Sequence, residues 1–493
     1  MNYLLYDLYS ILTEIYILIS ASILLIYGVF FTTSMKLGYP LLNKNLSLLI
    51  AQTIIFGLVL MLTQEYINLV SWNSFLILDN FSFGAKIILL IAVFGWFCLV
   101  SQYSIQQKLN AFEFWILVLL VIVAMLFIIQ VYDLLSIYLI IEFQSLIFYI
   151  FASFNRTSEF STEAGLKYFI LGAFASALLL FGSSLLYGFT GLTNLNDFSK
   201  LFTGFIFVDT FNFIGILTGL TFIISALLFK LSASPFHMWT PDVYEGSNII
   251  VTAFFSILPK LVIFSIFFRL LFFAFHDLVE YWNFIILICA LFSLIIGTLG
   301  AFMQIKWKRF MAYSSINHVG FLLLALATGS NDSVSSITFY IFVYMITTLG
   351  IFSFVMSLKN YTYPKIQQSR YLDNLLMLSI VNPLLAISMA VFLFSMAGIP
   401  PLAGFFSKLL ILITAIKSNI IGISLVAIIV NCIACFYYIR LIKGMYFDHK
   451  KHWPILVPIS KSISLVLGLS LIFLIFLTGD LELILLLSTS MAL

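Results

Sequence analysis

Charged side chains are scarce in this sequence. Only 9% of its 493 residues are Asp, Glu, Lys or Arg, and 63% are hydrophobic, whereas about 25% charged residues is usual for soluble domains. This deficit excludes a soluble globular protein. A membrane β-barrel is excluded as well, because the apolar runs are longer than barrel strands and do not alternate with polar residues. The composition therefore predicts an all-α membrane protein.

Residues that bind redox cofactors, metals or nucleotides are also few. The chain has four cysteines and five histidines, and they form no iron–sulfur set, no convincing haem pair and no Gly-rich nucleotide fingerprint. We interpret Cys432 and Cys435 as two small core residues, because no second cysteine pair accompanies them. No basic stripe indicates nucleic acid. We therefore expect no catalytic residue, cofactor site or metal site in this chain, and transport would draw its energy from a partner or an ion gradient.

The apolar runs divide into about fourteen segments of roughly 20 residues, the length that crosses a bilayer. They lie at approximately Ile15–Phe31, Leu46–Leu62, Phe83–Val100, Phe114–Val131, Leu134–Phe154, Tyr168–Tyr187, Ile214–Leu231, Ile249–Phe268, Phe284–Phe302, Phe310–Leu326, Ile337–Leu358, Pro383–Ala415 (interrupted), Ile420–Leu441 and Ser462–Leu477. We expect a single polytopic membrane domain over residues 1–493. The apolar tail at 483–493 is too short to span and is expected to lie against its neighbours or the interface.

Lysine and arginine gather in the loops that follow odd-numbered segments. They include Lys36, Lys108, Lys306, Lys308, Arg309, Lys450 and Lys451. The positive-inside rule then places both termini on the opposite side of the membrane.

The stretch from Lys230 to Ser247, KLSASPFHMWTPDVYEGS, interrupts the seventh segment. A cation at membrane depth costs several kcal/mol unless water or a partner meets it, so such lysines usually have a function. Pro235 has no N–H to donate, and it breaks the helix close to the charge of Lys230. Charged residues beside broken helices are typical of ion paths through transporters. We therefore predict a protein that translocates protons or cations.

A second broken segment has a similar design. In AGIPPLAGFFSK, Pro400 and Pro401 interrupt the twelfth segment and Lys408 follows them. The two broken segments lie five segments apart, and an odd spacing gives repeats of inverted orientation in the membrane.

Two further ionisable residues lie inside apolar runs. Glu142 is in the fifth segment, and Lys260 directly follows Pro259 in the eighth. Burial disfavours the charged form of a lysine, and a nearby carboxylate favours it. If Glu142 moved relative to Lys230, that lysine would gain or lose a proton. We predict that a row of such lysines, linked by water, passes protons along the membrane.

A competing interpretation applies to every lysine near a helix end, because its long side chain can extend to the membrane interface. We expect this for Lys167, Lys443 and Arg269. Lys230 and Lys260 lie deeper in apolar runs, which favours a function.

Polar residues of the tenth segment form a weaker candidate site. His318 in YSSINHVGF, with Tyr313 and Ser314, would bind water and relay protons or would pack helices together. His237 either gates the exit beyond Lys230 or lies at the interface.

Four stretches together resemble a known family. STEAGLKYFILGAF (161–174), KLSASPFHMWTPDVYEGS (230–247), YSSINHVGF (313–321) and AGIPPLAGFFSK (397–408) are similar to the antiporter-like subunits of respiratory complex I. Within that family the chain is most similar to the subunit 2 branch of mitochondrial NADH:ubiquinone oxidoreductase. The subunit 4 relatives carry a glutamate at the position of Lys408, so this residue argues against that branch.

The resemblance implies fourteen helices with two inverted five-helix repeats, at residues 114–268 and 284–441, and broken helices seven and twelve. It implies a proton path through Glu142, Lys230, Lys260 and Lys408. It also implies a non-redox membrane-arm subunit that couples quinone reduction elsewhere in the complex to proton pumping. NADH, FMN, iron–sulfur clusters and ubiquinone would then bind to partner subunits of the two arms.

The resemblance implies a location in the mitochondrial inner membrane, with both termini on the intermembrane-space side and lipids around the helices. A bacterial or thylakoid membrane is the alternative. The functional alternatives are a subunit of a multisubunit cation/proton antiporter and a transport-inactive scaffold of the same fold. The ionisable residues that are retained in the apolar runs weigh against the scaffold.

Overall fold

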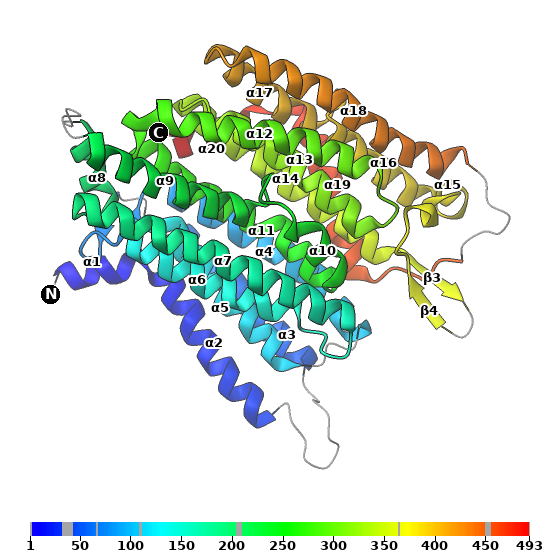
Figure 1. The fold of residues 1–493 in the computed structure, drawn as a ribbon. Helices are drawn as coiled ribbons and strands as arrows, with labels where there is room; N and C mark the ends of the chain where they lie inside the picture. Colours follow the sequence, from blue (N-terminus) through cyan, green and yellow to red (C-terminus); the bar gives the residue numbers. More distant parts are fainter. Residues whose placement is uncertain are drawn as a thin grey trace. The chain divides into compact units, whose positions relative to one another are not determined.

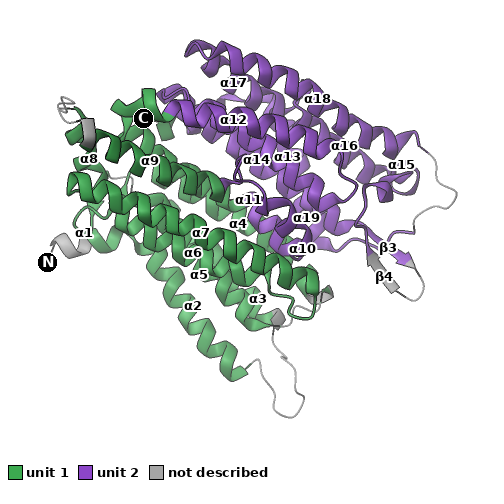
Figure 2. Ribbon diagram, viewed as in Figure 1, with its two compact units in different colours: residues 1–230, 258–282, 490–493 green, residues 231–257, 283–489 purple. Residues whose placement is uncertain are grey.

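Long helices make up most of the computed structural model (Figure 1). It describes residues 2–31, 43–65, 68–107, 111–203, 210–362, 365–448 and 455–492. These residues form two compact units (Figure 2). Unit 1 contains residues 1–230, 258–282 and 490–493, and unit 2 contains residues 231–257 and 283–489.

Unit 1 contains the N-terminal helices and one short hairpin. Its elements are α1 (Asn2–Ser10), α2 (Leu12–Phe31), α3 (Asn43–Thr63), β1 (Leu69–Ser71), β2 (Leu76–Leu78), α4 (Asn80–Gln106), α5 (Phe112–Gln130), α6 (Leu134–Ala152), α7 (Glu159–Thr190), α8 (Leu195–Thr203), α9 (Thr210–Leu231), the π-helix η1 (Phe268–Ala274) and the 3₁₀-helix η2 (His276–Leu278). The strands β1 and β2 pair antiparallel, with Val70 opposite Ile77.

Helices α11, α12 and α20 contribute residues to both units, and the remaining elements belong to unit 2. The elements are α10 (Trp239–Gly246), α11 (Ile249–Phe267), α12 (Val279–Phe302), α13 (Trp307–Leu326), α14 (Asn331–Ser357), β3 (Lys359–Thr362), β4 (Lys365–Gln368), the 3₁₀-helix η3 (Leu372–Leu375), α15 (Leu378–Val381), α16 (Pro383–Ala397), α17 (Ala403–Lys417), α18 (Ile421–Tyr446), α19 (Lys461–Gly479) and α20 (Glu482–Ala492). The strands β3 and β4 form a second antiparallel hairpin. The sequence analysis did not predict either hairpin.

Among the described residues, twelve helices are long and apolar enough to cross a membrane. They correspond to twelve of the predicted segments, so the chain is a multi-pass α-helical membrane protein. The other two predicted segments are α13, whose first turn carries Lys308 and Arg309, and the pair α16 and α17, which share one interrupted segment. The count of fourteen and the two inverted repeats stay predictions.

One helix lies at the centre of each unit. In unit 1, α5 contacts α2, α4 and α6, and 72% of its most apolar window is buried against 28% for α2. In unit 2, α14 contacts α13, α17 and α19, and its window is 89% buried against 28% for α19. A helix that is apolar on all sides has no polar face to turn to water, so it is stable only inside protein or lipid.

Both predicted helix breaks are present. Helix α9 ends at Leu231, three residues before the last residue ahead of Pro235, and α10 begins at Trp239. Ser232 adopts a left-handed conformation (φ 64°), and its hydroxyl donates to the Leu231 carbonyl. The carbonyl that the sequence analysis expected to be free near Lys230 is thus already bonded.

The second break separates α16 from α17. Gly398 has φ 80° and closes α16 by donating its N–H to the carbonyls of Phe394 and Ser395, a left-handed cap that glycine adopts without a Cβ penalty. The α17 helix starts at Ala403. Carbonyls at the end of α16 are therefore available to side chains from neighbouring helices.

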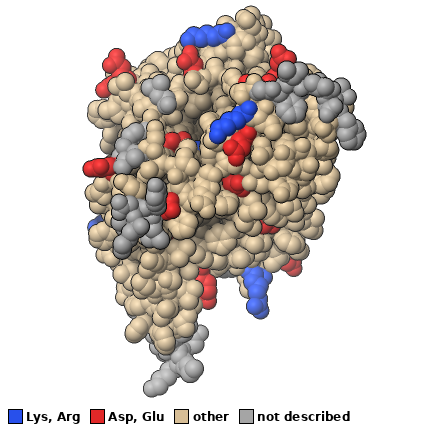
Figure 3. Space-filling view, turned by 90° about the vertical axis from the view of Figure 1, so that its left-hand side faces the viewer, with Lys and Arg blue, Asp and Glu red and all other residues tan. Residues whose placement is uncertain are grey.

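The surface carries few charges. On the face shown in Figure 3, most of the surface is uncharged and charged side chains are scattered. Of the loop lysines used to predict orientation, Lys36, Lys108, Lys450 and Lys451 lie outside the described residues. The apolar tail forms α20, and its Met491 packs against Gly84 of α4, where an added Cβ would lie 2.7 Å from the Met491 Cγ.

Candidate proton-translocation sites

The first candidate site is in unit 1, at the end of α9. The Nζ of Lys230 is buried and has no hydrogen-bond partner among the described residues. It lies 6.0 Å from the ring centroid of Tyr149 on α6, within the range of a cation–π interaction. Glu142, two turns earlier on α6, is in electrostatic range of Lys230. The structure therefore brings the predicted Lys230 and Glu142 together.

A hydroxyl group holds Glu142 in place. The Ser145 Oγ donates to the Glu142 backbone carbonyl at 2.9 Å and approaches its Oε2 at 3.3 Å. The carboxylate thus has a neutral partner on its own helix and a cationic partner on α9. A carboxylate with both kinds of neighbour can shift between them at small energetic cost.

A glycine on α7 allows Tyr149 to reach this position. A Cβ on Gly172 would lie 2.2 Å from the Tyr149 hydroxyl oxygen. A second glycine, Gly165, lets the same two helices approach closely, because its Cβ would lie 2.5 Å from the Ser153 Cβ. Both glycines belong to the STEAGLKYFILGAF stretch, so this motif sets the position of the ring that faces Lys230.

Lys260 occupies a fully buried helix. It is 4% exposed, and every residue in the most apolar window of residues 249–274 is buried. Pro259 lies inside α11, so the carbonyl one turn earlier receives no N–H from it. The side chain has no route to a lipid headgroup along its own helix, which excludes the interfacial alternative for this lysine.

Lys408 in unit 2 binds the end of the broken helix. Its Nζ donates to the carbonyls of Met396 and Ala397 at 2.7 and 3.0 Å and to the Asn431 Oδ1 at 2.6 Å. The side chain is 5% exposed, and Nζ lies 5.3 Å from the centroid of the Phe321 ring. The cation is therefore bound by the negative end of the α16 dipole and by an amide oxygen.

His318 lies in a hydrogen-bonded aromatic group of unit 2. Its Nδ1 is 2.6 Å from the Tyr340 hydroxyl on α14, and its Nε2 is 3.5 Å from the Tyr438 hydroxyl on α18. A small cavity beside it, lined by Tyr344, Thr347 and Met396 among others, has room for about one water molecule. The same Met396 supplies a carbonyl to Lys408, so the cavity connects the histidine to the second lysine site.

The other predicted relay residues have different surroundings. Tyr313 packs against α12, where a Cβ on Gly300 would lie 2.3 Å from its ring. Ser314 donates its hydroxyl to the Met311 carbonyl at 2.9 Å on its own helix. His237 is 4% exposed and its Nδ1 has no partner in the part of the chain that the structure describes. Burial lowers the pKa of His237, and a backbone hydrogen bond with Pro235 opposes that effect.

Charged residues outside the apolar segments connect α10 to the start of α13. Arg309 pairs with Asp242 at 2.8 Å and also with Glu245, and Lys306 pairs with Glu245. The Lys308 Nζ donates to the Ser247 carbonyl. These contacts fix the short helix after the first break against the helix that carries His318.

The interfacial expectation for Arg269 was wrong. Its side chain is 7% exposed, and its guanidinium donates to both carboxylate oxygens of Asp79 at 3.2 and 3.0 Å and to the Ile129 carbonyl at 3.0 Å. Burial alone would raise the pKa of Asp79, but the charge and hydrogen bonds of Arg269 outweigh it and lower that pKa. The carboxylate of Asp79, 79 residues into the chain, was not a partner that local sequence could identify.

Three participants were missed by sequence reasoning. Asn431, Tyr340 and Tyr149 each contact a predicted ionisable residue. Asn431 had a usable signal, because it is a polar side chain inside the apolar helix α18. The tyrosines had none, because aromatic residues are abundant in every segment. Cys432 is exposed, so it is not the core residue that we expected, whereas Cys435 donates its thiol to the Ala397 carbonyl at 3.3 Å.

A multi-pass helical chain with buried lysines beside helix breaks has the architecture of a membrane ion translocator. Comparisons with known proteins agree with this class. Residues 131–436 match the NADH:quinone oxidoreductase/Mrp antiporter TM family. The chain is 43% identical over 475 residues to NADH-ubiquinone oxidoreductase chain 2 of Marchantia polymorpha, covering 96% of this chain and 95% of the relative. The chain therefore belongs to this family of antiporter-like membrane subunits.

Solved structures share the fold. A chain of respiratory complex I from Thermus thermophilus with bound aureothin matches with a TM-score of 0.77 and 25% identity, over 96% of this chain and 98% of that one. A chain of the Mrp complex from Dietzia sp. DQ12-45-1b matches with a TM-score of 0.81, over 98% of this chain and 97% of that one. Its 19% identity supports the fold alone.

Proposed function

We propose that this chain is a proton-translocating membrane-arm subunit of NADH:ubiquinone oxidoreductase. The observation that carries the proposal is the placement of three buried lysines, Lys230, Lys260 and Lys408, each beside a helix break or a proline. Membership of the NADH:quinone oxidoreductase/Mrp antiporter family supports the same function. The identity to the Marchantia polymorpha relative supports a place in the mitochondrial inner membrane, among other membrane-arm and redox-arm subunits.

In this proposal the chain carries no redox chemistry. NADH, FMN, iron–sulfur clusters and ubiquinone bind to partner subunits, and the energy of quinone reduction reaches this chain as a change in its electrostatics or packing. Its own residues then hold and release protons. No electron has to pass through the chain for this to occur.

The Glu142–Lys230 pair is the control element. While the Glu142 carboxylate is close, it stabilises the ammonium form of Lys230, and the Tyr149 ring face adds a weaker attraction. If Glu142 turns toward Ser145, the buried cation loses its main partner and gives its proton to a neighbouring water. Water then passes the proton to the amine of Lys260, so that one proton leaves the first lysine and one reaches the second.

The Lys408 site is the second control element. Its three oxygen ligands keep the ammonium form in place without a carboxylate, so the site holds a proton without a permanent countercharge. His318, whose two ring nitrogens contact tyrosine hydroxyls, adjoins the cavity that reaches the Met396 carbonyl. A histidine can accept a proton at one nitrogen and release one at the other, which suits it to a relay.

The test is Lys230→Met in the complex reconstituted into liposomes. We expect fewer protons pumped per NADH oxidised, because methionine fills the space of lysine but cannot carry a proton. Lys200→Met is the matched control, since Lys200 lies on α8 with its side chain 69% exposed. An undiminished proton yield in Lys230→Met would refute the role of this lysine.

The two alternatives predict different results. A subunit of a free cation/proton antiporter would purify without a redox arm, whereas this proposal expects co-purification with NADH-oxidising subunits. A transport-inactive scaffold would tolerate removal of all three lysines without loss of proton yield. Neither alternative has an observation in its favour beyond the shared fold.

A further inference from the structure

A buried ion pair lies outside the residues that match the family model. Glu14 on α2 and Lys86 on α4 form a direct contact, and both side chains are 0% exposed. Neither residue belongs to the path described above. A lysine and a glutamate at this depth require an explanation, because ionisable residues inside membrane helices are rare and usually functional.

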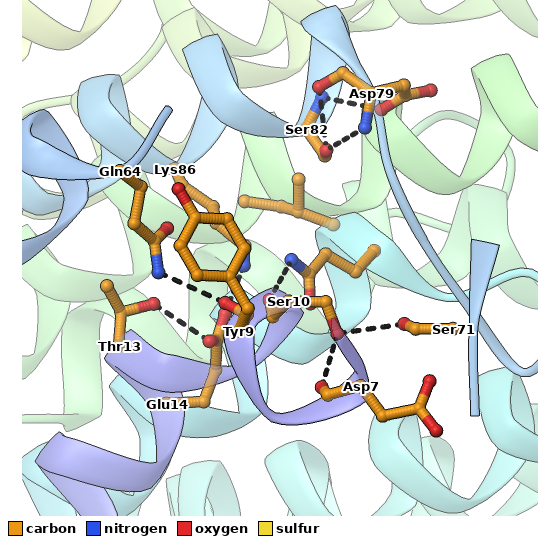
Figure 4. Close-up of polar contacts among 12 residues, drawn as sticks. Asp7, Tyr9, Ser10, Thr13, Glu14, Gln64, Ser71, Asp79, Ser82 and Lys86 are labelled. Atoms are coloured by element: carbon orange, nitrogen blue, oxygen red, sulfur yellow. Dashed lines mark hydrogen bonds and ion pairs between the residues drawn. The ribbon is translucent and has the colours of Figure 1, made fainter. Parts of the chain in front are cut away.

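Polar groups from three helices surround this pair (Figure 4). Thr13 donates its hydroxyl to the Glu14 Oε2 at 2.8 Å. Gln130, at the end of α5, is fully buried and donates its Nε2 to the Ser10 carbonyl at 3.0 Å. Its Oε1 has no partner within the described ranges. A buried amide oxygen without a partner indicates a position where water binds.

Hydrogen bonds continue from this group toward the exposed end of α1. The Ser10 hydroxyl donates to the Asp7 carbonyl at 2.8 Å and also contacts the Ser71 hydroxyl of β1 at 2.8 Å. Gln64 donates to the Tyr9 carbonyl at 3.2 Å, and Tyr9 itself reaches the Glu65 carbonyl at the surface. Figure 4 shows these side chains at the junction between α1 and α2. A row of polar groups thus joins a fully buried ion pair to a partly exposed helix end.

Stability alone does not account for the pair. Two charges lose most of their hydration on burial, and well-packed apolar residues of similar volume are often as stabilising or more so. A second pair, Asp79 with Arg269, lies within electrostatic range of Lys86, but its charges already compensate each other. An ion pair that is connected to the surface by hydrogen-bonding groups is instead suited to exchange a proton.

We propose that Glu14 and Lys86 form a second protonation site, which exchanges a proton with the aqueous phase through the polar row at Ser10 and Gln130. In the loading step, water at the exposed end gives one proton to the Glu14 carboxylate, which becomes a neutral acid beside the Lys86 ammonium. In the release step the same pair returns one proton and the ion pair re-forms. No other group is oxidised or reduced. The inference rests on the proposed function, because it supplies a further site to a proton-translocating chain.

The experiment measures protons pumped per NADH oxidised in the reconstituted complex. Lys86→Arg keeps the charge and the ion pair, but a guanidinium does not release its proton. The double variant Glu14→Gln with Lys86→Met removes both charges together. Asp197→Asn with Lys200→Met on α8 is the matched control, because that pair is exposed. We expect a lower proton yield in Lys86→Arg and in the buried double variant, and an unchanged yield in the control.

Other outcomes overturn the inference. A wild-type yield in the buried double variant or in Lys86→Arg would show that the pair exchanges no proton. Failure of the double variant to assemble would show that the pair is a structural requirement. If Lys230→Met loses yield while these variants do not, the inference fails and the proposed function stands. If Lys230→Met keeps its yield while these variants lose it, the proposed role of Lys230 fails instead.

Discussion

Asn431 offers a direct way to perturb the Lys408 site without removing the lysine. Its Oδ1 is 2.6 Å from the Lys408 Nζ and is one of three oxygens around this buried cation. Asn431→Leu has a similar size and removes this acceptor. The carbonyls of Met396 and Ala397 remain, so the lysine keeps its position at the end of α16 but binds its charge less well.

The expected effect follows from the energy of a hydrogen bond to a charged group, about 1.5–3 kcal/mol. Since about 1.4 kcal/mol is a factor of ten, loss of the Asn431 oxygen favours the neutral amine about ten-fold or more. The assay is proton yield as a function of pH in reconstituted complexes. Release of the Lys408 proton should begin at a pH about one to two units lower in Asn431→Leu than in wild type, which moves the alkaline limit of pumping downward.

Two controls decide the interpretation. Asn431→Asp keeps an oxygen at this position and should not lower the alkaline limit. Cys432→Ala changes an exposed residue next to it in α18 and should leave the profile unchanged. If Asn431→Leu has the same pH profile as wild type, the oxygen ligands of Lys408 do not control its proton, and the reasoning for this site is refuted.

Two other substitutions test the surroundings of unit 1. Gly172→Ala places a Cβ 2.2 Å from the Tyr149 hydroxyl oxygen, so we expect it to lose about 1–3 kcal/mol of stability and to lower proton yield; Gly188→Ala, which has open space around its Cβ, should do neither in melting and pumping assays. Asp79→Asn leaves the buried Arg269 without its carboxylate and should lower the free energy of unfolding by about 3 kcal/mol near neutral pH. Because the folded pKa of Asp79 is lowered from 3.8, its contribution is complete above pH 3.8 and is lost as the pH falls through the folded pKa. The melting temperatures of wild type and Asp79→Asn should therefore converge in acid, and a constant difference at low pH would contradict this.

Hydropathy and proline positions predicted much of the fold. Apolar runs of the right length indicated the membrane helices, because each span must satisfy its own backbone in lipid. Pro235 and the pair Pro400–Pro401 indicated both helix breaks, because proline cannot donate to a helix. Lys260 and Lys408 are buried as predicted, since their apolar flanks left no nearby interface.

Contacts between helices could not be read in the same way. His318 was visible as a polar residue, but its tyrosine partners lie on helices far away in sequence. Glu14 and Lys86 each lie near the start of an apolar run, where the sequence alone favours a side chain that extends to the interface. Only the packing of α2 against neighbours in unit 1 shows that both are buried and paired. The same limit explains the error at Arg269.

The central claim is that the amines of Lys230, Lys260 and Lys408 contact water inside the membrane and exchange protons through it. A density map of the assembled complex in a lipid bilayer, at a resolution that shows ordered water, tests this most directly. The account predicts water within hydrogen-bond distance of the Lys230 Nζ, continuing toward Lys260. Dry apolar packing around these amines, or lysine side chains extended to the headgroups, would contradict it.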